Sequence, residues 1–97
     1  MFLVTLTYTA DLAEVDAALA EHVAWLGRQY DDGVFAASGR RVPRVGGVIL
    51  AAGLTRDELE RRLAGDPFRM RGLAEYAVEE FVPSRVAPGL EQLLETR

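Results

Sequence analysis

The N-terminal stretch FLVTLTYT, residues 2–9, decides how the rest of the chain is interpreted. It consists of β-branched, aromatic and large aliphatic residues, which are typical of strands. Successive side chains of a strand point to opposite faces. One face then carries Phe2, Val4, Leu6 and Tyr8, and the other carries Leu3, Thr5, Thr7 and Thr9. The stretch therefore predicts a strand with two unequal faces.

A long helix is predicted after this strand. Asp11 followed by Glu14 is an acidic version of a helix-start signature. Side chains then recur at steps of three and four residues, which stacks them on one stripe of a helix. The stripe consists of Val15, Leu19, His22, Leu26 and Tyr30. Trp25 lies off its centre and is interpreted as a packing or dimer-contact residue. The sequence DDG at residues 31–33 ends the helix.

Two further strands are predicted at residues 34–39 (VFAASG) and 45–52 (VGGVILAA). The basic segment RRVPR at residues 40–44 joins them and contains a proline, which breaks a strand. We therefore expect the two strands to form a hairpin.

A second helix and a fourth strand follow. Thr55 and Glu58 have the spacing of a capping box, and the helix that they begin should stop at Gly65. Residues 75–82 (EYAVEEFV) predict a strand despite three glutamates. A short amphipathic C-terminal helix is expected to carry Leu90, Leu93 and Leu94.

The order β-α-β-β-α-β predicts an α+β, ferredoxin-like sandwich in which two helices cover one face of a four-stranded antiparallel sheet. We expect a single domain over residues 1–97, with the short C-terminal helix as an addition. The second face of the sheet is left bare in this arrangement. Because large exposed apolar patches are uncommon on monomers, we expect a homodimer.

Composition excludes several classes of function. The 97 residues carry 11 Lys and Arg against 15 Asp and Glu, a net charge of -4, which disfavours a binder of nucleic acid. The chain has no Cys and one His, so thiolate or multi-histidine metal centres are excluded. We expect no metal and no cofactor. Residues 1–10 are too short an uncharged run to span a bilayer and lack the flank of an export signal, so we expect a cytoplasmic protein that does not bind membranes.

His22 and Asp66 are the candidate catalytic residues. His22 lies in the apolar stripe and should point between helix and sheet, where it is either a structural histidine paired with a carbonyl or water, or a proton carrier. Asp66 precedes Pro67, which is the ordinary start of a turn or short helix with the carboxylate as its cap. A carboxylate beside an imidazole also fixes its tautomer, so together the two residues form a candidate acid–base pair.

Further polar residues are candidates for binding. Gly39 at the end of the second predicted strand would let a ligand approach the backbone, and the Ser38 hydroxyl can donate to a substrate oxygen, although this is equally an ordinary strand end. Most arginines are expected to face water. Arg69 or Arg71, close to Asp66 in sequence, can instead hold an anionic group.

These pieces resemble the YCII-related (YciI-like) family of small bacterial proteins over nearly the whole chain. The likeness rests on EHVAWL (21–26), DGVFAASG (32–39), GGVI (46–49) and GDPF (65–68) followed by GL (72–73). The resemblance implies a ferredoxin-like monomer that pairs into a dimeric α/β barrel, with a pocket containing a catalytic His and Asp that fall on His22 and Asp66.

The sequence departs from the family pattern at two positions. Arg40 stands where the family often has proline, and Arg71 stands where it often has a small residue; both alter the expected pocket rim. The best-defined reaction in the family is dehydrochlorination of a chlorinated hydroxyquinol, and related barrels include muconolactone isomerases. Substrate does not follow from fold alone.

The leading hypothesis is therefore a metal-free lyase or isomerase, similar to a dehydrochlorinase, that acts on a small oxygenated or aromatic molecule, with chlorinated rings among the candidates. His22 would move the proton, Asp66 would orient it, and Ser38 or a backbone N–H would hold a substrate oxygen. We expect a pocket lined by Val15, Leu19, Tyr8 and Phe68, with substrate contacts from Ser38, Gly39, Phe68, Tyr8 and Arg71. The alternative is a non-catalytic module that binds a small molecule or serves as a dimeric adaptor.

Overall fold

The computed structural model describes residues 1–95 and has the expected β-α-β-β-α-β order, with one additional helical turn. The elements are β1 (Phe2–Tyr8), α1 (Leu12–Asp31), β2 (Phe35–Arg40), β3 (Gly46–Ala51), α2 (Arg56–Leu63), α3 (Pro67–Met70), β4 (Ala74–Glu80) and the 3-10 helix η1 (Glu91–Glu95). Over the described part of the chain, none of the helices has the length and hydropathy needed to cross a membrane.

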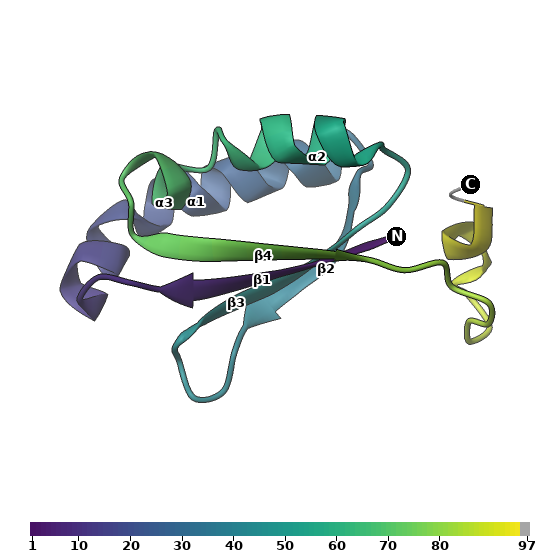
Figure 1. The fold of residues 1–97 in the computed structure, drawn as a ribbon, viewed down its shortest axis with the longest axis horizontal. Coiled ribbons are helices and arrows are strands. Elements are labelled where there is room, and N and C mark those ends of the chain that lie inside the picture. Colours follow the sequence, from purple (N-terminus) through teal and green to yellow (C-terminus); the bar gives the residue numbers. More distant parts are fainter. Residues whose placement is uncertain (96–97) are drawn as a thin grey trace.

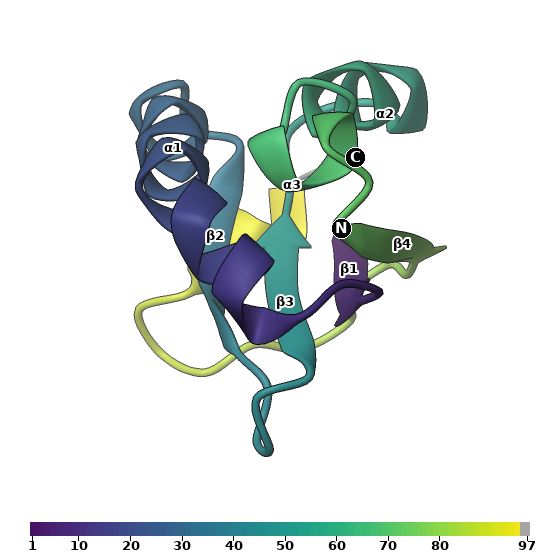
Figure 2. The ribbon, with the colours of Figure 1, turned by 90° about the vertical axis from the view of Figure 1, so that its left-hand side faces the viewer.

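The four strands form one antiparallel sheet in the order β2-β3-β1-β4. Helices α1, α2 and α3 all lie against the same face of this sheet (Figure 2). The short η1 lies beyond the end of the sheet, after the segment that leaves β4 (Figure 1). The predicted ferredoxin-like α+β fold and the predicted hairpin of β2 and β3 are thus confirmed.

The core lies between the sheet and the helices, as the two unequal faces of β1 predict. Phe2, Val4 and Leu6 are buried, whereas the side chains that alternate with them are half-buried or exposed. Each β1 residue shares its face with its antiparallel partners, so Val4 lies beside Ile49 of β3 and Val78 of β4. Burial of this apolar layer is the main stabilising contribution to the fold.

Helix α1 buries a different stripe from the one predicted. Its buried residues are Val15, Ala18, His22, Trp25 and Gln29. Leu19 and Tyr30, which were expected in the stripe, are 39% and 40% exposed. Trp25 is buried, with its ring centre 5.5 Å from that of Phe35 in β2 and its Nε1 donating to the Arg62 carbonyl of α2. The prediction selected large apolar residues, but the helix approaches the sheet along a line that includes the small Ala18 and the polar Gln29.

An irregularity in β2 determines which of its side chains face the helices. Phe35 pairs with Ala51, but Ala37 pairs with Leu50, so Ala36 is an extra residue that forms a β-bulge. Downstream of the bulge, Ser38 pairs with Ile49, whose side chain belongs to the core. Phe35 and Ser38 therefore both face the helices although they are three residues apart.

The glycine pair that begins β3 allows a close approach to β1. A Cβ atom on Gly46 would lie 1.7 Å from the backbone oxygen of Leu6, so only glycine fits there. Gly47 is less constrained, since its Cβ would lie 3.1 Å from the Gly39 oxygen. This tight contact fixes the spacing of β1 and β3 at this end of the sheet.

The helix termini agree with the sequence in two cases and differ in one. Thr55 and Glu58 form the predicted capping box of α2. Asp66 caps α3 with its side chain, and Pro67 occupies the first turn. Asp11 stands at the N-terminus of α1 but makes no side-chain capping hydrogen bond, contrary to expectation.

The fourth strand is shorter at its end than the predicted range 75–82. β4 ends at Glu80, so Val82 lies outside the strand and is 78% exposed.

Candidate active site

His22 is held rigidly in the interior of the fold by α1. Its side chain is 11% exposed and its ring stacks on Phe68 of α3, with ring centres 3.9 Å apart and planes 5° apart. Trp25, one turn further along α1, lies 5.8 Å from the same ring. These contacts restrict rotation of the imidazole and fix the direction of both ring nitrogens.

Asp66 meets His22 from the junction between α2 and α3. Its carboxylate is fully buried, and Oδ1 lies 2.8 Å from Nδ1 of His22, 44 residues away in sequence. The same oxygen accepts a hydrogen bond of 3.0 Å from the backbone N–H of Phe68, which is the N-cap interaction of α3. Both interpretations of Asp66 therefore apply at once: its carboxylate caps a short helix and contacts the imidazole.

Tyr76 of β4 supplies a third donor, because its hydroxyl donates to Oδ2 of Asp66. Burial, together with this hydrogen bond to a carboxylate, raises the pKa of Tyr76 well above its usual value. Tyr76 was not among the residues predicted to belong to the site. Its signal was the alternation of the fourth strand, which places Tyr76 on the same side as Val78, where a buried hydroxyl requires an acceptor.

The hydrogen bonds of Asp66 determine the tautomer of His22. An ionised carboxylate only accepts hydrogen bonds, so Nδ1 carries the hydrogen in this pair. The other ring nitrogen, Nε2, then has a free lone pair in the neutral ring and lies on the side of the imidazole away from Asp66. A histidine arranged in this way can accept a proton at Nε2 and later return it.

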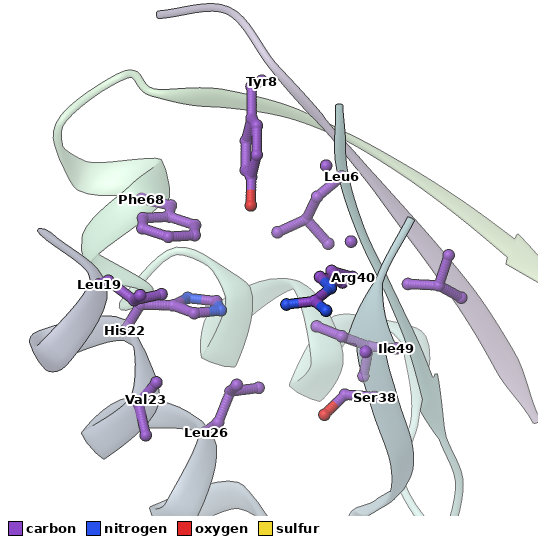
Figure 3. A pocket seen from close by; sticks show the side chains of 14 residues that line it. Leu6, Tyr8, Leu19, His22, Val23, Leu26, Ser38, Arg40, Ile49 and Phe68 are labelled. Carbon is purple, nitrogen blue, oxygen red and sulfur yellow. The ribbon is translucent and has the colours of Figure 1, made fainter. Parts of the chain in front are cut away.

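A pocket of about 280 Å³ opens in front of His22, between α1 and the β2–β3–β1 part of the sheet. Figure 3 shows the His22 ring at one wall, with Phe68 beside it and Leu26 below. Its lining residues are Leu6, Tyr8, Leu19, His22, Val23, Leu26, Ser38, Gly39, Arg40, Gly46, Gly47, Val48, Ile49 and Phe68. The wall is mostly apolar, with a few polar groups, as in many sites that bind small organic molecules.

Four of the five predicted substrate contacts line this pocket: Ser38, Gly39, Phe68 and Tyr8. The Ser38 hydroxyl also forms a 2.7 Å hydrogen bond with the Tyr30 hydroxyl, which fixes its position. Arg71 does not line the pocket; it directly follows α3 and forms an ion pair with Glu21 on the surface. Val15 does not line the pocket either, since it is fully buried in the core.

Arg40, which was expected to alter the pocket rim, is exposed and lines the pocket. It is the last residue of β2 and lies two positions after Ser38, on the same face of the strand. Figure 3 shows its guanidinium directed into the space across from His22. The departure from the family pattern at this position was the signal in the sequence.

Among the residues that the structure describes, no three side chains of the types His, Cys, Asp or Glu are grouped so that they could hold a metal ion.

Residues 1–82 match the family model of the YCII-related domain. The chain belongs to the YCII-related family. The resemblance expected from EHVAWL and GDPF is thereby confirmed.

Solved structures resemble the fold of this YCII-related protein. One is 5-chloro-2-hydroxyhydroquinone dehydrochlorinase (TftG) from Burkholderia phenoliruptrix AC1100, in complex with 2,5-dihydroxybenzoquinone. It has 20% sequence identity and a TM-score of 0.71, and the match covers 82% of this chain and 91% of that chain. At this identity the similarity shows a shared fold.

A second similar structure is a mutant of SnoaB, a cofactor-independent oxygenase from Streptomyces nogalater. It has 20% identity and a TM-score of 0.49, with coverage of 90% of this chain and 94% of that chain. No curated protein matches the sequence.

Proposed function

We propose that this protein is an acid–base enzyme of the lyase or isomerase type that acts on a small oxygenated or aromatic molecule. One observation carries the proposal: His22 is bonded through Nδ1 to the fully buried Asp66 and lines a 280 Å³ pocket with the rest of its ring. A histidine that only filled the core would be close-packed on all sides, with no cavity beside its ring.

Each polar group near the pocket has a role in this proposal. His22 takes a proton from the substrate through Nε2, and Asp66 holds the ring in the productive tautomer and stabilises its protonated form. Tyr76 and the Phe68 N–H hold Asp66 in place as positioning groups. General acid–base catalysis of this kind contributes about 100- to 10,000-fold to a rate.

Elimination of hydrogen chloride from a chlorinated hydroxyhydroquinone is a suitable first reaction to test. Two hydroxyl groups of the substrate lose their protons, the carbon that bears chlorine takes up one proton and releases chloride, and the ring becomes a hydroxyquinone with a net loss of one HCl. The electron pair of the broken C–Cl bond leaves with chloride, so no external oxidant is required. The proposal draws support from TftG, which shares the fold and acts on a compound of this class.

His22→Asn provides the sharpest test of the catalytic role. The asparagine amide can still donate to Asp66 from close to the Nδ1 position, but nothing replaces Nε2. We expect turnover of a panel of chlorinated hydroxyhydroquinones and unsaturated lactones to fall at least about 100-fold, with an unchanged far-UV circular dichroism spectrum. Chloride release and quinone absorbance measure the first reaction class, and lactone absorbance measures the second.

Two results would contradict the enzyme proposal. A folded His22→Asn variant that keeps the wild-type rate removes His22 from the chemistry. Tight binding of panel compounds by wild-type protein, without any turnover, would favour the non-catalytic binding module instead. Arg28→Ala is a matched control, because Arg28 is exposed on the same helix and does not line the pocket.

We also propose that the protein forms a homodimer through the sheet face opposite the helices. The strand register places Leu3, Val48, Leu50 and Ala77 on that face, so its centre is mostly apolar, with Thr5 among them and Glu75 and Glu79 along the β4 edge. Such a surface is more favourable when it is covered. Light scattering at micromolar concentration should give the mass of two chains, and Leu50→Lys should give the mass of one; a wild-type monomer would contradict the proposal.

A further inference from the structure

Arg40 brings a cation into a pocket that contains no carboxylate. Of the pocket-lining residues, His22 and Arg40 are the ones with basic side chains, and none is Asp or Glu. This is unexpected in a chain with 15 acidic residues and a net charge of -4. The nearest acidic group to the chemistry, Asp66, is fully buried behind His22 and already accepts three hydrogen bonds.

Several other arginines pair with carboxylates on the surface. Arg44 pairs with Asp16, Arg62 with Asp32, and Arg71 with Glu21. Within residues 1–95, no ion pair or side-chain hydrogen bond involves Arg40. Its guanidinium is therefore free to bind a ligand, and its exposure at the pocket mouth allows the ligand to exchange with solvent.

The position of Arg40 is set by the strand and not by a flexible tail. β2 pairs along its length with β3, and Arg40 lies opposite Gly47, whose lack of a side chain leaves room above the sheet. Ser38, two residues earlier, faces the same space. In Figure 3 the guanidinium and the His22 ring face each other across the pocket, with Leu6, Leu26 and Ile49 around them.

We propose that the natural substrate carries a carboxylate and that Arg40 is the specificity-determining residue that binds it. This inference rests on the proposed function and narrows its substrate class to small ring or unsaturated acids. The planar guanidinium can bind both carboxylate oxygens at once, while the apolar walls contact the ring. The reacting hydrogen of such a substrate then lies on the His22 side of the pocket.

A pair of ligands that differ in charge but not in shape tests the proposal. The probes are 2,5-dihydroxybenzoate and 2,5-dihydroxybenzamide, and their dissociation constants are measured by isothermal titration at low salt. We expect the wild-type protein to bind the acid about tenfold or more tightly than the amide, as a charge-assisted bidentate contact provides. In Arg40→Met the two constants should agree to within about twofold.

Arg28→Met is the matched control. It removes the same charge from an exposed position outside the pocket, so it should keep the wild-type preference for the acid. Equal binding of acid and amide by wild-type protein, an unchanged preference in Arg40→Met, or an equal loss of preference in both variants would each overturn the role of Arg40.

The outcomes also separate this inference from the proposed function. If neither probe binds but neutral ring substrates are turned over by a His22-dependent route, the carboxylate proposal is wrong and the enzyme proposal stands. If the acid binds with the expected preference but the His22→Asn variant keeps full turnover, Arg40 is the ligand-binding residue and the acid–base mechanism is wrong.

Discussion

Replacement of Asp66 by alanine should cost much of the stability of the protein. The carboxylate is fully buried and accepts hydrogen bonds from His22, Tyr76 and the Phe68 N–H. Alanine leaves all three donors without an acceptor in a place that water does not reach. Each unpaired buried donor costs about 1 to 3 kcal/mol. Because neighbouring groups relax, we expect a total loss of about 3 to 5 kcal/mol in the free energy of unfolding.

The assay is urea unfolding followed by the fluorescence of Trp25, the single tryptophan, which is 3% exposed in the folded protein. Asp11→Ala is the matched control, since Asp11 also begins a helix but makes no side-chain capping bond. It should cost about 0.5 kcal/mol through the helix dipole alone. Asp66→Asn retains an acceptor oxygen, so its cost should lie between the two and remains measurable if Asp66→Ala does not fold. Equal costs for Asp66→Asn and Asp11→Ala would refute the reasoning.

Two further predictions concern the sheet. Gly46→Ala forces a Cβ to within 1.7 Å of the Leu6 oxygen, so the free energy of unfolding should fall by about 2 kcal/mol or more. Gly27→Ala is the control: a Cβ at this position of α1 has no atom within 4 Å, so the free energy of unfolding should rise by about 0.5 to 1 kcal/mol. A urea midpoint for Gly46→Ala at or above the wild-type value would contradict the close contact. Burial raises the pKa of Tyr76 above its usual 10.0, so the folded state retains this proton where the unfolded state loses it. The Tyr76 contribution to stability is therefore fully present below pH 10 and is lost as pH rises beyond it. In urea titrations from pH 8 to 11, the free energy of unfolding of Tyr76→Phe should fall less steeply with pH than that of wild type. Parallel curves would show that Tyr76 does not titrate differently in the folded and unfolded states.

Local patterns predicted the elements of this fold well. The capping box at Thr55 and the DDG sequence at residues 31–33 depend on interactions between residues close in sequence, whereas the alternation of residues 2–9 reflects the burial of one strand face. Such signals survive in the folded protein because tertiary contacts do not compete with them.

The buried face of α1 was harder to predict. Leu19 and Leu26 have the hydropathy of core residues, but in the structure they line the pocket. Periodicity cannot distinguish an apolar side chain that packs in the core from one that borders a cavity, because both avoid water. Ala18 and Gln29, which do face inward, have no hydropathy signal that would select them.

The candidate site was predicted in part for a similar reason. His22 and Asp66 were recognisable by residue type and by family resemblance, but their contact joins positions 44 residues apart. Sequence reasoning missed Tyr76, and it placed Arg40 at the pocket rim without predicting that its guanidinium is directed into the cavity. Each lies on a particular face of a strand, and that face is known only once the pairing of the strand has been established.

Ala36 is an extra residue in β2 that changes the phase of the strand. It shifts the inward and outward alternation by one position, so that Phe35 upstream and Ser38 and Arg40 downstream all point the same way. A related chain that lacks one of the two alanines at positions 36 and 37 would restore simple alternation and still direct the serine and arginine inward. A gap or insertion between Ser38 and Arg40 would instead turn the guanidinium out of the cavity. In alignments of this family, the location of a one-residue gap in this edge strand therefore determines whether the residue aligned with Arg40 faces the pocket.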